Sequence, residues 1–330
     1  MVDVHVSKSI LEKKKRVCRS PGIGFFIFNL GLGIALTLLI TAPSVFLLDS
    51  HILGYPHDGF AYIWKMWWTR KALLDMHTSP ADLSYINYPY AGYNPHLLAS
   101  VLPHIFALPL LNGLGPLQTY NGLVLAAFAL SLPFTAHLCY AFCHNRWAAS
   151  VGGVVYAFFT NKVAHAIGGH LGHIFIFWFP LGVLYLYRSW QKPGQRQNSV
   201  LAGVLLAFSI LVDLKLTALL IFPFVGLFWL FYAVVERHRW NRERVISMGT
   251  VLGLMVLIAA PFFVPIITAR SAGRLEHFQK LDATRHAADI TSFFVPSAQH
   301  PLYSIWEPLK AYSTKLASMG WHENVFYLGT

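Results

Sequence analysis

The sequence predicts an all-α polytopic membrane protein with about seven to eight apolar spans. Of the 330 residues, 55% are hydrophobic and only 12% are charged. Soluble domains carry about 25% charged residues, so this composition excludes a soluble enzyme and a disordered chain. Apolar runs recur along the whole chain, and the formal net charge of +11 gathers in a few of the breaks between them.

The chain begins with a basic segment, residues 1–22, which we interpret as a cytoplasmic tail. The apolar run at 24–48 follows, with about 25 residues, which is enough to cross a bilayer. This run is too long for a signal peptide and lacks a small-residue cleavage site, so we interpret it as a retained first span. Because Lys and Arg favour cytoplasmic segments, the N-terminus is expected in the cytoplasm.

Residues 49–95 are polar and rich in aromatic side chains, and we expect them to form a loop on the outer face. Within this loop, residues 58–76 predict an amphipathic helix at the membrane surface, where Trp and Tyr are favoured. The apolar side chains expected to share its broad face are Phe60, Trp64, Trp67, Trp68 and Leu74.

Further apolar runs lie at 97–113, 118–142, 147–160, 173–187, 199–212, 216–235 and 246–267. The basic breaks at 144–146, 188–196 and 236–244 are assigned to the cytoplasm. The transmembrane domain would then span 23–267, and 268–330 would form a second outer loop. The run 97–113 would start and end on the outer side. We therefore expect a re-entrant or tilted segment there, and the alternative is that one span is wrongly assigned.

The basic charge follows this predicted topology. Fourteen of the 25 Lys and Arg residues fall in the four segments assigned to the cytoplasm, against four acidic residues. The two outer segments hold nine basic and nine acidic residues. The charge therefore marks the cytoplasmic side, and we expect no nucleic-acid partner.

Asp58 is the first candidate for chemistry, and the residues alone leave two interpretations open. An aspartate at the start of a helix fits an N-terminal cap, which its position favours. The same carboxylate could act as a general base on an acceptor hydroxyl at the membrane surface.

The layout also resembles the GT-C superfamily of integral membrane glycosyltransferases. The stretches that carry the resemblance are HDGFAYIWKMWW at 57–68, NYPYAG at 87–92, GVVYAFFT at 153–160 and FPL at 179–181. They are similar to bacterial multi-span proteins related to the protein O-mannosyltransferases, the lipid A aminoarabinose transferases and the YfhO-like proteins. The resemblance covers residues 24–330.

This resemblance implies a sugar donor linked to polyprenyl phosphate and transfer to a glycan, lipid or protein acceptor at the outer face of the cell inner membrane. It assigns the general base to Asp58, with Asp49 as a weaker alternative at the exit of the first span. Related enzymes often show two adjacent acids, whereas here His57 precedes Asp58. His57 would assist catalysis or bind acceptor, or it is simply an exposed loop residue.

A phosphate leaving group needs positive charge or backbone donors at the outer surface. The candidate cations are Lys162, Lys215, Arg270 and Arg274. Lys215 lies with Asp213 between two apolar runs, where an ion pair must face water or a partner. A short solvated turn explains this pair equally well. Arg270 and Arg274 follow a span, where basic side chains commonly reach to the headgroups.

Three histidines, His165, His170 and His173, fall in one outer turn. Imidazole clusters bind metals. However, glycines at 168, 169 and 172 argue against a fixed helical ligand face, and no carboxylate neighbours them in sequence. A metal site is therefore the less favoured interpretation, and no cofactor is required. The resemblance to GT-C enzymes instead assigns these histidines, with Asp213 and Glu323, to the lining of the acceptor or donor cavity. Glu323 could instead cap a following span.

Two other classes of function stay open. A transporter or lipid flippase would carry ionisable residues at mid-membrane depth, and the apolar runs are almost free of them. A non-catalytic scaffold related to GT-C enzymes is the second. The chain also ends where another span would begin, so we expect it to be the front part of a longer protein. No nucleotide-binding or hydrolase motif occurs in it.

Overall fold

The computed structural model describes residues 21–86, 88–89, 92–236, 240–273, 307–308 and 311, and for residues 57 and 215–218 the backbone alone. Within these residues all regular structure is helical, apart from one isolated antiparallel bridge between Asp82 and Tyr93. The expected all-α class is confirmed. The segments are α2 (Ile23–Thr41), the 3-10 turn η1 (Ser44–Leu47), α3 (Pro56–Arg70), the π turn η2 (Lys71–Asp75), the 3-10 turn η3 (Pro95–Leu98), α4 (Val101–Cys143), α5 (Arg146–Ala157), α6 (Thr160–Ile167), α7 (Leu171–Ile174), α8 (Phe179–Gln191), α9 (Arg196–Val212), α10 (Leu214–Val235) and α11 (Arg242–Ser271).

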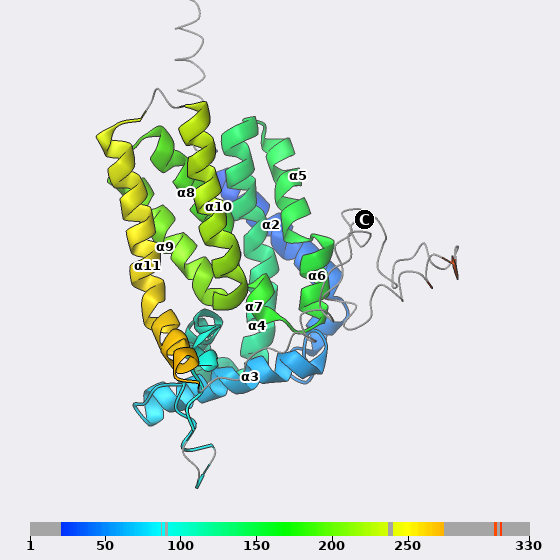
Figure 1. Cartoon of the computed structure of the whole chain (residues 1–330). Helices are drawn as coiled ribbons and strands as arrows, with labels where there is room; N and C mark the ends of the chain where they lie inside the picture. The colour runs from blue at the N-terminus through cyan, green and yellow to red at the C-terminus, as the bar shows by residue number, and fades with distance from the viewer. Residues whose placement is uncertain are drawn as a thin grey trace, which may run out of the picture.

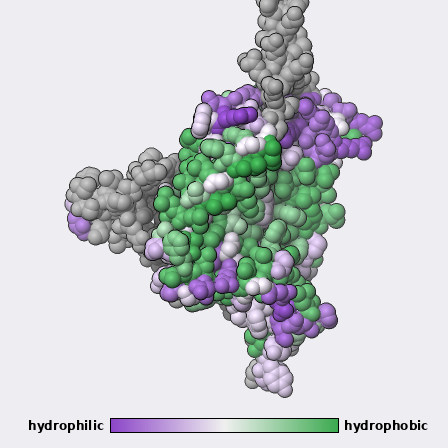
Figure 2. Space-filling model, turned by 180° about the vertical axis from the view of Figure 1, so that it is seen from behind, coloured by the Kyte–Doolittle hydropathy of each residue, from purple (hydrophilic) through white to green (hydrophobic). Residues whose placement is uncertain are grey.

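Four helical segments of the described chain are long and apolar enough to cross a membrane: Ile23–Thr41, Val101–Cys143, Leu171–Gln191 and Arg242–Ser271. Figure 2 shows apolar side chains over the middle of the molecule and polar ones toward both ends. These are the properties of a membrane protein. The larger number of spans expected from the sequence is not confirmed. One reason is that α5 has only 12 residues, whereas a span needs about 20.

The helices α4, α5 and α8 to α11 stand side by side, and α3 lies across one end of this bundle (Figure 1). The connections from α4 to α5 and from α8 to α9 lie at the opposite end, where α10 ends and α11 begins. Two contacts agree with this view. The Trp190 indole, near the end of α8, donates to Oε2 of Glu236, just after α10, at 2.9 Å. The Phe142 ring, near the end of α4, lies 4.8 Å from the Tyr187 ring of α8. The bundle therefore has an α3 end and a basic end.

Close packing between helices depends on small residues. A Cβ atom added at Gly33 would lie 2.5 Å from a carbonyl oxygen of α4, and one at Gly153 would lie 2.7 Å from another. A Cβ atom at Gly203 would lie 3.1 Å from a carbonyl oxygen of α11. Such contacts let helix backbones approach one another, which is how helices associate within membranes.

The helix α3 is shorter than the predicted 58–76 and carries two apolar faces. It starts with Pro56 at its first helical position and passes into η2 at Lys71. The prediction that Trp68 shares one face with Phe60 and Trp67 is wrong. Trp68 is buried and its indole donates to the Pro80 carbonyl at 2.8 Å, whereas Phe60 and Trp67 are exposed.

The 43-residue helix α4 is interrupted at Gly115, whose φ of 73° and ψ of 170° are not helical. Its first part, 101–114, runs beside α3. His104 packs against Tyr62, with ring centroids 5.9 Å apart, and Asn112 accepts a hydrogen bond from Arg70 at 3.1 Å. The two contacts are eight residues apart on both helices, so the helices run parallel at the α3 end. The second part of α4 then continues through the bundle (Figure 1).

Candidate functional site

The start of α3 is docked on the turn between α6 and α7, residues 165–173, which we call the histidine turn. Gly169 makes this docking possible. Its φ is +80°, and a Cβ atom there would lie 2.6 Å from the backbone nitrogen of Gly59 and 2.9 Å from the Tyr55 carbonyl oxygen. The backbone N–H of Tyr55 also donates to the Ile167 carbonyl. The glycines that seemed to weaken a histidine site therefore bring α3 against it.

Two buried tyrosines hold the histidine turn. The Tyr62 hydroxyl accepts the Gly172 N–H at 3.0 Å, and the Tyr120 hydroxyl donates to the Gly169 carbonyl at 3.3 Å. Burial raises the pKa of the Tyr62 hydroxyl well above its ordinary value. The Gly172 N–H opposes this rise, and the negative charges of Asp213 and Asp58 add to it. Tyr62 therefore stays a neutral hydroxyl, and the turn has a fixed position relative to α3.

The three histidines of the turn lie together. His165 Nδ1 and His170 Nδ1 are 2.9 Å apart, and either nitrogen can be the donor. The His165 and His173 rings stack at 4.5 Å, and the His170 and His173 centroids are 5.4 Å apart. One ligand atom from each imidazole can be chosen so that all three lie within 4.8 Å of one another. The expected clustering of these histidines is confirmed.

Asp58 joins this cluster from α3. Its Oδ2 lies 2.8 Å from His170 Nε2, with the Asp58 side chain 56% exposed and the His170 side chain 9% exposed. The N-cap position of α3 belongs to Tyr55, and Asp58 lies in the first helical turn. The prediction that Asp58 caps the helix is therefore wrong in detail. So is the expectation that no carboxylate stands near the histidines, because Asp58 reaches them from a distant part of the chain.

Asp213 also lies near the site. It follows α9 and is half-buried, and its charge raises the pKa of Tyr62. The neighbouring Leu214 N–H donates to the Ala99 carbonyl at 2.7 Å, which ties the start of α10 to the segment before α4. The backbone of Lys215 lies in the first turn of α10. The side chain of Lys215 lies outside the described atoms.

Of the other candidate cations, Lys162 and Arg270 lie in described helices and Arg274 lies outside the described residues. Lys162 is 9% exposed, and its ammonium donates to the Ala127 carbonyl at 3.0 Å and to the Ser131 hydroxyl. It is thus held by α4 in the interior. Arg270 is exposed in the last turn of α11. Outside the described atoms lie the side chain of His57 and the whole of Arg274 and Glu323.

Three site residues were missed by sequence reasoning. Tyr62 stands one helical turn after Asp58, and that spacing was the available signal. Asn121 accepts the Leu53 N–H at 2.8 Å and donates to two carbonyls of the loop before α3, so it fixes the entry to that helix. His104 is fully buried, and among the described residues neither of its ring nitrogens has a hydrogen-bond partner. Polar side chains inside apolar runs are the signal for the last two.

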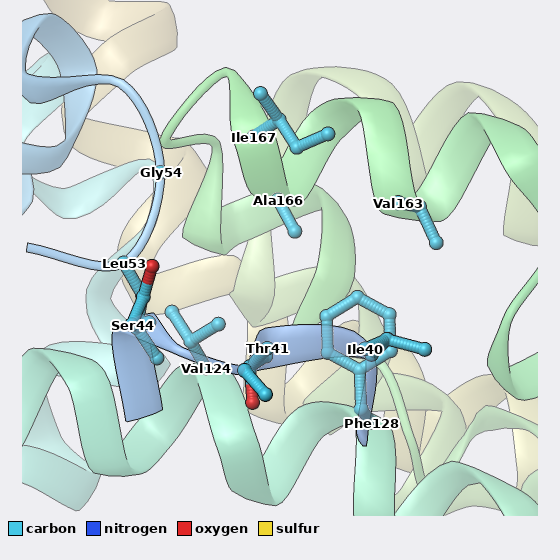
Figure 3. A pocket seen from close by; sticks show the side chains of 11 residues that line it. Ile40, Thr41, Ser44, Leu53, Gly54, Val124, Phe128, Val163, Ala166 and Ile167 are labelled. Carbon is cyan, nitrogen blue, oxygen red and sulfur yellow. The ribbon is translucent and has the colours of Figure 1, made fainter. Parts of the chain in front are cut away.

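An apolar cavity of about 190 Å³ lies behind the histidine turn. Its walls come from the end of α2, η1, α4 and α6 (Figure 3). Ala166 and Ile167 line it and lead directly into the turn, and Gly54 lines it next to the start of α3. The hydroxyls of Thr41 and Ser44 are the polar groups at this cavity.

No protein-family model, no curated protein and no solved structure matches the chain. The resemblance to GT-C enzymes therefore stays a prediction from the sequence motifs. What the site can do chemically is argued from the positions of its residues.

Proposed function

We propose that the chain is a GT-C-type membrane glycosyltransferase that transfers a sugar from a polyprenyl-phosphate donor to an acceptor at the α3 end of the bundle. The observation that carries the proposal is the pair formed by Asp58 and His170 at 2.8 Å. It places a half-exposed carboxylate, held by a buried imidazole, at the end of an apolar helical bundle.

In this proposal Asp58 is the general base. Transfer requires an acceptor hydroxyl or amine to lose a proton as it attacks the sugar carbon that is bonded to phosphate. A positioned carboxylate contributes typically 10²- to 10⁴-fold to such a step. His170 orients the carboxylate through Oδ2, and the exposure of Asp58 leaves the carboxylate accessible to an acceptor. Tyr62 and Tyr120 keep the imidazole in place by holding its turn.

The donor would be bound by two features of the chain: apolar helix surface for its lipid tail and a basic side chain for its phosphate. Its isoprenoid tail would pack on apolar surface near the cavity between α2, α4 and α6, which is adjacent to the histidine turn. Its phosphate would be bound by Lys215, which begins α10 next to Asp213, with Arg270 and Arg274 as further candidates. Lys162 is a weaker candidate than the sequence implied, because α4 already accepts hydrogen bonds from its ammonium.

The orientation proposed is a multi-pass protein of the inner membrane with its N-terminus in the cytoplasm and α3 on the outer face. The basic residues that follow α4 and α8, and those at the start of α11, belong to the end of the bundle opposite α3, which supports this orientation. The exposed apolar face of α3, with Phe60 and Trp67, supports a position of that helix at the membrane surface.

The test is transfer in membranes that contain the full chain, supplied with polyprenyl-phosphate sugars. Release of free polyprenyl phosphate is the readout, because it does not depend on the acceptor. We expect Asp58→Asn to lower the rate at least about 100-fold while the protein still inserts. Asp75→Asn is the matched control, since Asp75 is also a carboxylate of the segment between α2 and α4 but pairs with Arg70 and Lys71. Full activity of Asp58→Asn would overturn the assignment.

One observation favours a transporter or lipid flippase as the second candidate. Lys162 and His104 are buried ionisable residues within the helical bundle, and such residues commonly mark transport pathways. Reconstitution in vesicles separates the two functions. A flippase would move labelled polyprenyl-phosphate sugar between leaflets without releasing polyprenyl phosphate, and Lys162→Met would slow it. A non-catalytic scaffold would do neither.

A further inference from the structure

The histidine turn has the geometry of a metal site that the sequence did not predict. Three imidazoles come from three positions: His165 from α6, His170 from the cap of α7, and His173 from α7 itself. Because they stand on two short helices joined by glycines, the three rings converge, although no single helix face could present them. His173 Nδ1 is buried and makes no hydrogen bond within the part of the chain that the structure describes.

The spacing of the nitrogens suits a small divalent cation. Zinc bonds imidazole nitrogen at about 2.0–2.1 Å, so two nitrogens of a tetrahedral site lie about 3.3 Å apart. His165 Nδ1 and His170 Nδ1 are already 2.9 Å apart. The three ligand atoms lie within 4.8 Å of one another, and rotation of side chains would close this spacing onto an ion.

The surroundings supply the support that metal-binding histidines need. A metal-bound imidazole usually donates its second N–H to a carboxylate or carbonyl, which fixes its orientation. His170 has this arrangement: its Nδ1 faces His165, and its Nε2 faces Asp58 at 2.8 Å. The turn itself is held by the Tyr62 and Tyr120 hydroxyls, so the ligands are positioned before a metal binds.

The ligand chemistry selects a class of metal. Neutral imidazole suits Zn²⁺ and its neighbours Co²⁺, Ni²⁺ and Cu²⁺, whereas Mg²⁺ and Ca²⁺ prefer oxygen ligands. Three protein ligands leave a fourth position of a tetrahedral site for an exchangeable ligand.

We propose that His165, His170 and His173 bind one divalent transition-metal ion, Zn²⁺ in the first instance, with Asp58 as the carboxylate that orients His170. This inference does not rest on the proposed sugar transfer, because metal binding is measured without donor or acceptor.

The test uses the full chain, purified in detergent on a tag that contains no histidine and freed of metal by chelation. Zn²⁺ affinity is measured by competition with a chromophoric chelator, and Co²⁺ binding is followed by the visible absorption of tetrahedral cobalt. We expect one ion per chain. Loss of an outer carboxylate typically costs 10- to 100-fold in affinity, so Asp58→Asn should lower affinity by about that factor. His165→Gln and His173→Gln should each lower it by more than about 100-fold.

His77→Gln is the matched control, because His77 is exposed on the loop after η2. The Zn²⁺ affinity of the His77→Gln variant should equal that of the wild type. Wild-type affinity in both His165→Gln and His173→Gln would overturn the proposal, as would the absence of stoichiometric binding of Zn²⁺, Co²⁺ or Ni²⁺ to the wild type.

A measurement on the wild type covers the case in which a variant fails to fold. X-ray absorption of the zinc-loaded chain should show imidazole nitrogens at about 2.0 Å and no sulfur neighbour. A shell containing sulfur would assign the ion to a cysteine and overturn the proposal. Zinc should also raise the midpoint of thermal unfolding of the wild type, since a ligand that binds only the folded state stabilises it.

Discussion

Tyr62 connects α3 to the histidine turn through one hydroxyl group. The hydroxyl accepts the Gly172 N–H at 3.0 Å inside a fully buried environment. No other acceptor for that N–H is present among the described contacts. The position of the turn therefore depends on a neutral tyrosine, and a phenylalanine of similar shape would remove the hydroxyl group alone.

We expect Tyr62→Phe to destabilise the protein by about 1–3 kcal/mol, the cost of leaving a buried donor unsatisfied. The effect should depend on pH in a defined direction. Because the pKa of Tyr62 is raised in the folded chain, its stabilising contribution is complete below the ordinary tyrosine pKa of about 10 and is lost as pH rises toward the folded value. The difference in thermal midpoint between wild type and Tyr62→Phe should therefore shrink above about pH 10.

The control for this measurement is Tyr93→Phe, because the Tyr93 side chain is exposed. That variant should match the wild type at neutral pH and at high pH. A Tyr62→Phe protein as stable as the wild type at neutral pH would contradict the role given to this hydroxyl.

At the element scale, the docking of α3 on the histidine turn depends on close approaches at glycines, and Gly169 is the one that lies against the backbone of α3. A Cβ at Gly169 would meet backbone atoms of α3 and of the residue before it, at 2.6 Å from Gly59 nitrogen and 2.9 Å from Tyr55 oxygen. Backbone atoms cannot move aside as a flexible side chain can. The positive φ of Gly169 adds a conformational cost of about 1–2 kcal/mol for any other L-residue.

We expect Gly169→Ala to displace α3 from the turn, lowering the thermal midpoint and weakening the contact between Asp58 and His170. Zinc affinity should fall with it, because the carboxylate would no longer orient the imidazole. Gly249→Ala is the matched control, since nothing lies within 4 Å of a Cβ placed there. Gly169→Ala with unchanged stability and zinc affinity would show that docking does not position the site.

The contributions of α3 and of the histidine turn could each be predicted from the sequence, but their contact could not. Aromatic content predicted a surface helix at α3, and the spacing of His165, His170 and His173 predicted that they lie in one turn. Asp58 and His170 are 112 positions apart, and periodicity carries no information about such a pairing. The docking geometry depends on Gly169 having a positive φ, which a pattern of glycines reveals only once the partner helix is known.

The two apolar faces of α3, one buried and one exposed, could not be predicted from the sequence for a related reason. Trp67 and Trp68 are adjacent and equally apolar, yet Trp67 is exposed and Trp68 is buried under the loop at Pro80. Hydropathy alone treats both as residues for a membrane surface. The Trp68 indole donates its hydrogen bond to the carbonyl of Pro80, a residue 12 positions away that hydropathy does not take into account.

At the scale of the whole molecule, the two ends of the bundle differ in charge and in structure. The end opposite α3 carries basic connections, including Arg188, Lys192 and Arg196 around the connection from α8 to α9. The α3 end carries the histidine turn and Asp58. Since cytoplasmic loops are enriched in Lys and Arg, this asymmetry predicts that the α3 end faces the outer side of the membrane.

Accessibility of single cysteines to a membrane-impermeant maleimide tests that orientation. Starting from a chain in which Cys18, Cys139 and Cys143 are replaced by serine, we expect Ser84→Cys to be labelled in intact cells. Ser84 is exposed in the loop that follows α3. Gln197→Cys, exposed at the start of α9, should be labelled only after the membrane is permeabilised. The reverse pattern would place Asp58 in the cytoplasm, where a transferase acting at the outer face could not use it.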